Sequence, residues 1–529
     1  MTKKKEIVFL LIIIAIASFF RLYKLNSIPP GLYPDVGING NEAFGGLKTG
    51  NFKLFYPENN GREGLMMWLI ALSFSIFGVS IWSIKIVAAI IGILTVLGLY
   101  LLTNELFSFN SPTFQHSNTP TIISLLSSFF LAISFWHVNF SRIGFRGILL
   151  PFILVFSFYF LFKGFRTKKI GELILAGLIF GLGFYTYISF RMAVILLLIT
   201  LSLWWLIYKK QNLRRQFFQF AICNLTFAIL TALPIGFYLL QNPQDFVGRV
   251  ASISVFATES PVKEFFKSLI LHFGMFNFYG DPNWRHNFAG SPMLFWPIGI
   301  LFLIGLFYSI SQIEKTPFGF LISWWLIMLL PGILTYEGIP HALRTIGVIP
   351  VVYIFAALGG NYLYNWLNNK IENKKFLLVA GCLLLIFFGF AEFQKYFLCW
   401  AENPEVKNAF SLDYVKMGNY LNSLPKEIKK YVIVNMPGVP VPYPNGIPMP
   451  AQTIMFVENT KYGKIQSTYL LPEDLDKIKI DGEKTVILLM RYDEQLFDTL
   501  KYRFPQGEIE ERNGILMYKI NFYGCMQLI

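Results

Sequence analysis

Long, uninterrupted apolar runs recur through the first 400 residues of this chain, and they constrain its fold more than any other feature. A helix needs about 20 apolar residues to cross the hydrocarbon of a bilayer, where only a helix satisfies its own backbone. About eleven runs are long enough. They cover residues 7–23, 82–103, 120–137, 143–162, 171–188, 190–208, 217–240, 291–310, 317–335, 345–366 and 376–398. Because 54% of residues are hydrophobic and only 14% charged, we predict an α-helical polytopic membrane protein with about 11 transmembrane helices.

The pattern changes beyond residue 400. An amphipathic segment at 405–424 stops at Pro425. Short apolar runs then replace the long ones, at residues 431–434, 453–457, 485–490 and 515–518. Short runs mixed with an amphipathic helix are typical of a small α/β fold. We therefore expect a transmembrane domain over residues 1–400 and a small C-terminal α/β soluble domain over residues 401–529.

Basic residues gather in short segments between the apolar runs. The net charge is +14, but this clustering is the positive-inside pattern of membrane proteins, so we expect no nucleic-acid partner. The clusters are Lys3–Lys5, 163–169, 209–215 and 370–375. The runs counted above place all four clusters on the cytoplasmic side, whereas a further span at 65–78 would separate the first cluster from the others.

This count predicts a multi-pass protein of the cell (plasma) membrane with a cytoplasmic N-terminus and an extracytoplasmic C-terminal domain. Segment 65–78 is then an interfacial or re-entrant helix beside the bundle. Most of the polar loop sequence lies on the outer side, above all in the first outer loop, residues 24–81. We therefore look for a functional site on the outer face.

Three acidic residues of this first outer loop are candidate catalytic residues: Asp35, Glu42 and Glu63. A carboxylate near the bilayer surface can take the proton of an attacking hydroxyl, which is the task of a general base. Asp35 is the preferred base. Its alternative role is to cap a helix running through residues 36–48.

Two pairs of basic residues lie at the outer mouths of predicted spans. Arg142 and Arg146 are four residues apart, so they would share one helix face. His341 and Arg344 stand at the entry of another span. The guanidinium groups of the three arginines can bind a phosphate through paired hydrogen bonds, and the imidazole of His341 can donate one to it. All four residues are therefore candidate phosphate ligands. The alternative is that they anchor their helices at the interface.

A polar and aromatic segment at 278–287 contributes further candidates. Asp281, Trp284, Arg285 and His286 could bind an acceptor or a sugar, with Trp284 stacking on a sugar ring. A plain structural turn at Asp-Pro-Asn is the alternative. The four cysteines lack metal-ligand spacing, and we find no nucleotide-binding motif. We predict no metal site and no fixed cofactor, while a need for a divalent cation stays open.

Carboxylates and arginines on the outer face, without a cytosolic nucleotide-binding domain, indicate a substrate that resides in the membrane. Transfer of a sugar from a lipid phosphate needs only a base for the acceptor hydroxyl and cations for the departing phosphate. The sequence therefore favours a glycosyltransferase with a lipid-linked donor.

Several motifs share their order with a known family: Pro34-Asp35, REGLMMWLIALS at 62–73, FSRIGFRGILLP at 140–151, GDPNWRHN at 280–287 and PHALR at 340–344. In these motifs the chain resembles the bacterial family 39 glycosyltransferases of the GT-C superfamily, which stand with the protein O-mannosyltransferases and lipid A aminoarabinose transferases. The resemblance implies a polyprenyl- or dolichyl-phosphate sugar donor, transfer at the outer face and Asp35 as base. Val36 departs from the acidic pair of that family, and Gly64 departs from its Lys-Pro-Pro-Leu motif.

The acceptor, whether protein, lipid or glycan, is not determined by the sequence. Three other functions compete with the transferase: a transporter or flippase of lipid-linked glycans, a glycan ligase that uses lipid diphosphate donors, and a structural subunit. A transporter would need charged or broken helices at mid-membrane. The predicted spans are almost free of charge in their interiors.

Overall fold

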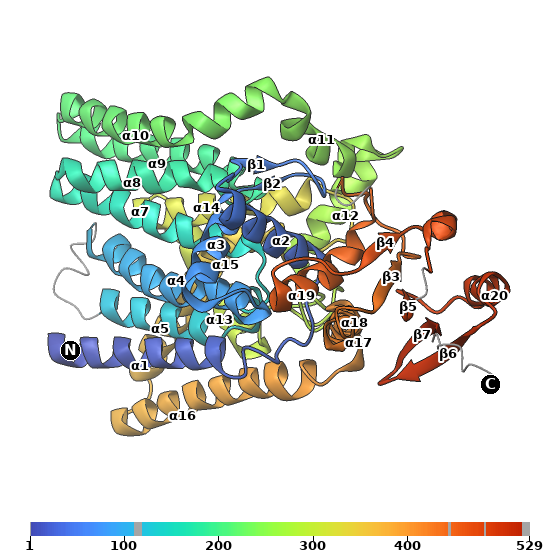
Figure 1. The fold of residues 1–529 in the computed structure, drawn as a ribbon. Coiled ribbons are helices and arrows are strands. Elements are labelled where there is room, and N and C mark those ends of the chain that lie inside the picture. The colour runs from blue at the N-terminus through green and yellow to red at the C-terminus, as the bar shows by residue number, and fades with distance from the viewer. Residues whose placement is uncertain (1, 110–118, 443–445, 481–482, 521–529) are drawn as a thin grey trace, which may run out of the picture.

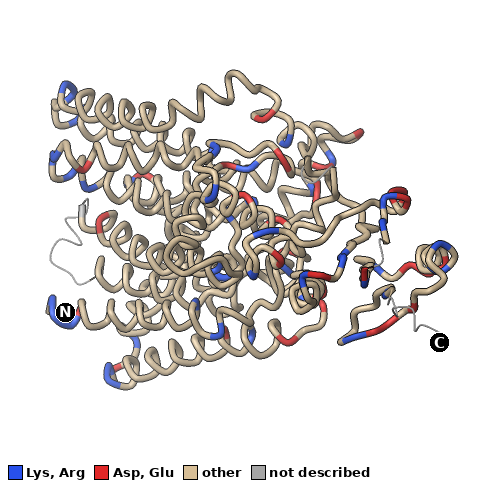
Figure 2. The backbone as a smooth tube through the Cα atoms, viewed as in Figure 1, with Lys and Arg blue, Asp and Glu red and all other residues tan. Residues whose placement is uncertain are grey.

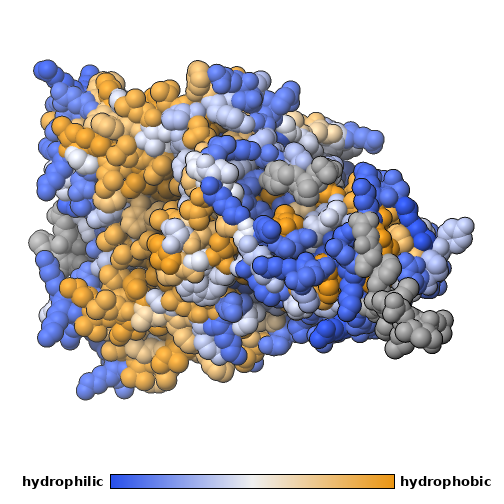
Figure 3. All heavy atoms as spheres, in the orientation of Figure 1, coloured by the Kyte–Doolittle hydropathy of each residue, from blue (hydrophilic) through white to orange (hydrophobic). Residues whose placement is uncertain are grey.

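A computed structural model describes residues 2–109, 119–442, 446–480 and 483–520 of the chain. Long helices lie side by side in a bundle, and a small sheet with its own helices covers one end of it (Figure 1). Apolar side chains dominate the visible surface of the bundle, while hydrophilic ones dominate its end and the sheet region (Figure 3). This distribution is the one expected for a protein embedded in a bilayer.

Each predicted apolar run contains a helix. These are α1 (Lys3–Leu22), α4 (Ile81–Phe109), α5 (Thr119–Ile133), α7 (Leu149–Thr167), α8 (Ile170–Leu182), α9 (Ala193–Lys210), α10 (Arg214–Gln241), α13 (Trp296–Ser311), α14 (Thr316–Ile333), α15 (Ile349–Asn368) and α16 (Lys374–Phe393). Within the described residues, 7 helical segments are long and apolar enough to cross a membrane on their own; α5, α8 and α13 are shorter apolar helices. The predicted fold class, a polytopic helical membrane protein, is confirmed.

Helix α3 (Leu65–Phe77) belongs with α5, α8 and α13 to the shorter apolar helices of the described residues. Its 13 residues extend over about 20 Å, less than the roughly 30 Å of a hydrocarbon core. It joins α4 directly after Gly78 and packs against α4 and α2 (Pro34–Thr49). The interfacial or re-entrant placement of segment 65–78 stays a prediction, because α8 also has 13 residues and is counted among the spans.

The basic clusters lie at one end of the bundle. The start of α1 and the connections α7–α8, α9–α10 and α15–α16 carry Lys and Arg at the same end, which Figure 2 shows on the left. The opposite end holds α2, the two-stranded hairpin of β1 (Phe55–Tyr56) and β2 (Arg62–Glu63), and helices α11 (Pro243–Ile253) and α12 (Pro261–Gly274) (Figure 1). The candidate site residues belong to this second end.

The C-terminal residues form a five-stranded sheet in the order β4-β3-β5-β7-β6. Strand β3 is parallel to β4 and β5, and β7 is antiparallel to β5 and β6. The bounds are β3 Lys429–Ile433, β4 Thr468–Leu470, β5 Thr485–Leu489, β6 Gly507–Arg512 and β7 Ile515–Ile520. Alternate residues face opposite sides, since Val432 packs with one apolar cluster and Ile433 with the other.

Helices cover both faces of this sheet. They are α18 (Leu412–Ser423) and α19 (Gln452–Tyr462) on one face and α20 (Glu494–Arg503) on the other, while α17 (Pro404–Ala409) packs on the main core. The apolar run 453–457 therefore lies in a helix, whereas the other three runs supply β3, β5 and β7. Helix α19 also packs on α2, where Thr453 donates to the Leu32 carbonyl at 2.9 Å and Phe456 joins the main core. The sheet region is thus fixed against the first outer loop.

Candidate functional site

The turn between strands β1 and β2 connects two candidate residues. Asn59 donates a hydrogen bond to Asp35 at 3.0 Å, and the Gly61 carbonyl accepts one from Arg146 at 3.1 Å. The backbone has φ of 54° at Asn59 and 84° at Gly61. A Cβ at Gly61 would lie 2.6 Å from the Phe55 ring, so this position requires glycine. The turn thereby holds a carboxylate and a guanidinium from distant segments near each other.

Asp35 lies within the first turn of α2. The helix begins at Pro34 with Tyr33 as its N-cap residue, and no side chain caps it. The alternative that Asp35 caps a helix at 36–48 is therefore wrong, because the proline starts the helix one residue earlier. A carboxylate in the first turn is still favoured by the helix dipole. Its hydrogen bond from Asn59 is to the hairpin rather than to its own helix.

Glu63 pairs with Arg146 at 3.0 Å, with side chains 6% and 19% exposed. Arg146 lies in the short 3-10 helix Arg146–Ile148 that precedes α7. Its guanidinium is 5.4 Å from the centre of the Tyr187 ring. The pair orients a cation that keeps part of its surface accessible, as a phosphate ligand requires.

Tyr187 lies within electrostatic reach of two of the predicted phosphate ligands. Burial raises the pKa of its hydroxyl, and the charges of Arg146 and Arg344 oppose that shift. Arg344 donates to Thr335 at 2.9 Å and to the Glu337 carboxylate at 3.1 Å. Sequence reasoning missed Tyr187; its only signal is a polar aromatic residue where two apolar runs meet. Arg146 thus contacts Tyr187, and the charge of Arg344 acts on the same hydroxyl.

Arg191 was also missed. It lines a cavity of about 20 Å³ together with Glu63, Tyr187 and apolar side chains from α10 and α11. Its guanidinium donates to the Phe246 carbonyl and lies 4.1 Å from the centre of that ring. An arginine at the start of an apolar run was the signal that could have identified it. The end of the bundle that carries the candidate site therefore holds more cations than the sequence analysis named.

Glu42 is engaged by Arg62 at 2.8 Å, and the two side chains are 6% and 0% exposed. Arg62 also donates to Asn39 at 2.9 Å. Glu42 and Asn39 belong to α2, and Arg62 also donates to the Glu58 carbonyl of the hairpin, so this buried cation fixes the hairpin on the helix. A catalytic role for Glu42 stays a prediction, and its contacts are those of a positioning residue.

Arg142 and Arg146 do not share a helix face, so this prediction is wrong. Helix α6 (Phe135–Phe140) ends before Arg142, and the chain turns at Gly144 with φ of 78° before the next helical turn begins. Arg142 is fully buried and donates to the carbonyls of Phe20, Tyr23 and Ile28 at 2.7–2.9 Å. Its contacts hold the end of α1 and the start of the first outer loop, and Arg146 points to Glu63 instead.

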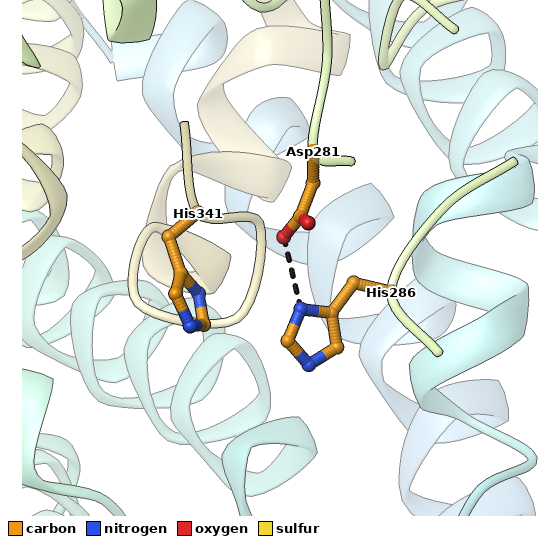
Figure 4. Close-up of side chains that lie close together, drawn as sticks. All are labelled: Asp281, His286 and His341. Atoms are coloured by element: carbon orange, nitrogen blue, oxygen red, sulfur yellow. Dashed lines mark hydrogen bonds and ion pairs between the residues drawn. The ribbon is translucent and has the colours of Figure 1, made fainter. Parts of the chain in front are cut away.

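Asp281 organises the segment that follows α12. One carboxylate oxygen accepts from the backbone N–H of Asn283 at 2.8 Å, which is the expected turn. The other accepts from His286 Nδ1 at 2.9 Å and from the Ala342 N–H at 2.7 Å. Figure 4 shows His286 and His341 on either side of this carboxylate, with ring centres 5.0 Å apart. Segments 281–286 and 341–344 are thus joined.

The same three side chains are the candidate ligands for a cation. One ligand atom each from Asp281, His286 and His341 lies within 4.8 Å of the others. Two imidazoles and a carboxylate suit a divalent ion such as zinc. Hydrogen bonds already use several of these atoms, since His341 Nδ1 accepts from the Arg344 N–H at 3.3 Å. A cation would have to replace those bonds, and a cation requirement stays a hypothesis.

Two neighbouring histidines are held neutral by their surroundings. Burial lowers the pKa of His341 well below its usual value, and the charge of Arg344 adds to this shift. Burial also lowers the pKa of His272 to about 4. His272 Nε2 accepts the backbone N–H of His341 at 3.2 Å. Neutral imidazoles here can accept and donate hydrogen bonds without adding charge.

Arg285 and Trp284 are neighbours in sequence but contact different aromatic rings. The Arg285 guanidinium lies 3.8 Å from the centre of the Tyr33 ring. Burial raises the pKa of Tyr33, the charge of Asp35 adds to the shift and that of Arg285 opposes it, so Arg285 and Asp35 flank one tyrosine. The Trp284 ring packs on Phe288 at 5.1 Å between centres. Sugar stacking by Trp284 is a prediction that no contact tests.

These contacts bring the four predicted segments together at one end of the bundle, between its helices and the sheet (Figure 1). Asp35, Glu63, Arg146 and Arg344 converge there, joined by the segment of Asp281 and His286. Arg142 does not join them, because its guanidinium is enclosed by backbone carbonyls.

Known proteins resemble this chain in part of its sequence and in its fold. Residues 65–238 match the family model described as dolichyl-phosphate-mannose-protein mannosyltransferase. The fold is similar to that of ArnT from Cupriavidus metallidurans bound to undecaprenyl phosphate, with a TM-score of 0.58, 11% identity and 98% of each chain covered. ArnT in the apo state gives a TM-score of 0.55 at the same identity and coverage. No curated protein sequence matches the chain.

A second fold match is AglB, an oligosaccharyltransferase from Archaeoglobus fulgidus in complex with an inhibitory peptide and a dolichol-phosphate. The TM-score is 0.50 at 14% identity, over 80% of this chain and 58% of that one. At such identities the likeness is one of fold. With the family-model match, it confirms the resemblance to the GT-C superfamily.

Proposed function

We propose that this multi-pass membrane protein, whose fold is that of the GT-C glycosyltransferases, moves a sugar from a polyprenyl-phosphate donor to an acceptor hydroxyl at the outer face of the membrane. The observation that carries the proposal is the β1–β2 turn, which holds Asp35 through Asn59 and Arg146 through Gly61. A base and a cation at one site are the two groups that the transfer requires. The lipid phosphates bound by ArnT and AglB support a donor of this class.

In this proposal, Asp35 accepts the proton of the acceptor hydroxyl as its oxygen forms a bond to the anomeric carbon of the sugar. The bond between that carbon and the phosphate oxygen breaks, and its electron pair stays on the lipid phosphate. Arg146 and Arg344 stabilise the developing charge, with Tyr187 beside Arg146 as a hydrogen-bond donor. Glu63 keeps Arg146 in position before the donor arrives.

The proposed orientation places the basic connections in the cytoplasm and the site outside. It is supported by the gathering of Lys and Arg at the end where α1 begins (Figure 2). Single cysteines at Asn212, in the α9–α10 connection, and at Asn60, in the hairpin, test it in a background without native cysteines. A membrane-impermeant maleimide applied to intact cells should label only the hairpin position. If only Asn212→Cys is labelled, the basic connections lie outside and the proposed orientation is wrong.

Transfer of radiolabelled sugar from a polyprenyl-phosphate donor in proteoliposomes tests the reaction. Asp35→Asn should lower the rate about 10²- to 10⁴-fold. The matched control is Asp413→Asn, since Asp413 is exposed on α18 and pairs only with Lys416 among the described residues. Full activity of Asp35→Asn would remove Asp35 as base. Competition by a lipid diphosphate sugar, but not by the monophosphate, would favour a ligase.

A further inference from the structure

A second cavity lies apart from the proposed catalytic site. It has a volume of about 400 Å³ and opens between helix α2 and helix α19 of the C-terminal region. Such a volume is within the usual range of small-molecule sites. Glu42, which pairs with the buried Arg62, lines this cavity, whereas Asp35, Arg146 and Arg344 do not. The cavity is therefore lined by a different set of residues from the proposed base and phosphate ligands.

Carboxamide side chains form one wall of the cavity. Asn41 donates to Gln452 Oε1 at 2.9 Å, and Asn459 donates to Asn41 Oδ1 at 3.0 Å. These bonds link α2 to α19 and fix the amide groups before any ligand arrives. Asn51 and Thr49 add polar groups on the other side. Fixed amides and hydroxyls are suited to the hydroxyl groups of a saccharide.

Two lysines give the cavity a positive charge. Lys48 lies 4.3 Å from the centre of the Phe44 ring and donates to the Gly463 carbonyl, which is neutral. Lys53 is 45% exposed and meets Glu58 only at 3.5 Å. The one acidic residue that lines the cavity, Glu42, is offset by Arg62. An anionic ligand would thus meet two ammonium groups.

The floor of the cavity is bare helix backbone. No atom lies within 4 Å of a Cβ built on Gly45, and the neighbouring surface is formed by Met455 and Ile465. The C–H faces of a sugar ring could lie on such a surface while its hydroxyls reach the amides. A larger side chain at Gly45 would fill the space without displacing any neighbour.

We infer that this cavity binds an anionic saccharide, one that carries a carboxylate or a phosphate, and that the C-terminal region supplies half of the site. The inference rests on the cavity and its charges and not on the proposed transfer reaction. It also explains why α19 is fixed so firmly on α2, because both walls of the site must keep their relative position.

Calorimetric titration of the full chain in lipid nanodiscs tests the inference. The probes are trigalacturonate and glucose 6-phosphate, with neutral maltotriose and pentaglutamate as comparisons. We expect an anionic saccharide to bind, and binding to weaken at higher salt. Gly45→Leu should weaken it at least tenfold. The matched control is Gly381→Leu on α16, where a Cβ also meets nothing within 4 Å.

Lys53→Gln keeps the test independent of folding, since Lys53 is exposed. It should weaken binding of the anionic probes and flatten the salt dependence while the melting temperature stays unchanged. Three results would overturn the inference: neither anionic saccharide binds, Gly45→Leu binds them as the unchanged chain does, or maltotriose or pentaglutamate binds equally well. If Asp35→Asn loses sugar transfer but still binds the anionic probes with unchanged affinity, this site is distinct from the catalytic one.

Discussion

Asp35 and Arg146 hydrogen-bond to the same turn of the β1–β2 hairpin, although they come from distant segments of the chain. Among the described residues, no hydrogen bond or ion pair joins the two side chains directly. The hairpin therefore sets their separation. This relationship makes the turn residues as important for the proposed reaction as the reacting groups themselves.

Replacing Asn59 by glycine tests the positioning of Asp35. Asn59→Gly keeps the left-handed backbone, with φ of 54°, but removes the hydrogen bond to the carboxylate. We expect kcat to fall about five- to tenfold, as for the loss of one hydrogen bond, with little change in KM for the donor. The control is Asn60→Gly, whose φ is 63°. Equal effects of the two variants would contradict the positioning role.

Arg146 should not tolerate lysine. Arg146→Lys keeps the charge but loses the paired hydrogen bonds of the guanidinium, so kcat/KM for the donor should fall about 10- to 100-fold. Arg166→Lys is the control, because Arg166 forms a similar pair with Glu105 in the last turn of α7, whereas Arg146 lies just before that helix begins. Steady-state transfer rates over a range of donor concentrations measure both. An unchanged kcat/KM in Arg146→Lys would remove Arg146 as a phosphate ligand.

Arg142 should affect stability rather than donor binding. Arg142→Met leaves three buried carbonyls without their donor, and we expect the unfolding free energy to drop by about 3 kcal/mol or more. Thermal unfolding in detergent would show this, with the exposed Arg214→Met as control. The donor KM of the remaining folded protein should be unchanged. A raised donor KM at normal stability would restore Arg142 to the phosphate site.

Tyr187→Phe removes a hydroxyl that stays protonated at neutral pH, since burial raises its pKa. If this hydroxyl donates a hydrogen bond to the phosphate of the lipid-linked sugar, the KM for that substrate should rise several-fold. This is the effect expected when one hydrogen bond worth about 1 kcal/mol is lost. Tyr185→Phe is the control, because its hydroxyl donates to the Thr231 carbonyl instead. A rise in both variants would point to a general packing effect.

Stability should fall in acid because of His272. Burial holds the pKa of His272 at about 4, whereas the unfolded chain has a value near 6.5. The unfolded state then binds the proton more readily than the folded state. The free energy of unfolding is therefore highest above pH 6.5 and falls as the pH is lowered toward 4. Melting temperatures across this window should decline less steeply in His272→Gln. Parallel curves for the two proteins would contradict this assignment.

The local pattern of the sequence predicts most of the fold. Apolar runs give the spanning helices because the bilayer demands internally bonded backbone over a fixed length. Charge clustering predicts which connections share one end. The short apolar runs after residue 400 predict a small mixed domain, although the run at 453–457 is a helix.

The roles of individual residues depend on contacts that no local pattern contains. Arg142 and Arg146 look alike in sequence, but the turn at Gly144 sends one into backbone carbonyls and the other to Glu63. The roles of Tyr187 and Arg191 can be inferred only from their contacts with residues of other helices.

The sequence by itself thus determined the membrane fold, the grouping of the charged ends and the four segments that carry the candidate residues, because hydropathy and charge act over short stretches of chain. The tertiary structure alone decided which side chains converge, since hydrogen bonds join residues that are far apart in sequence.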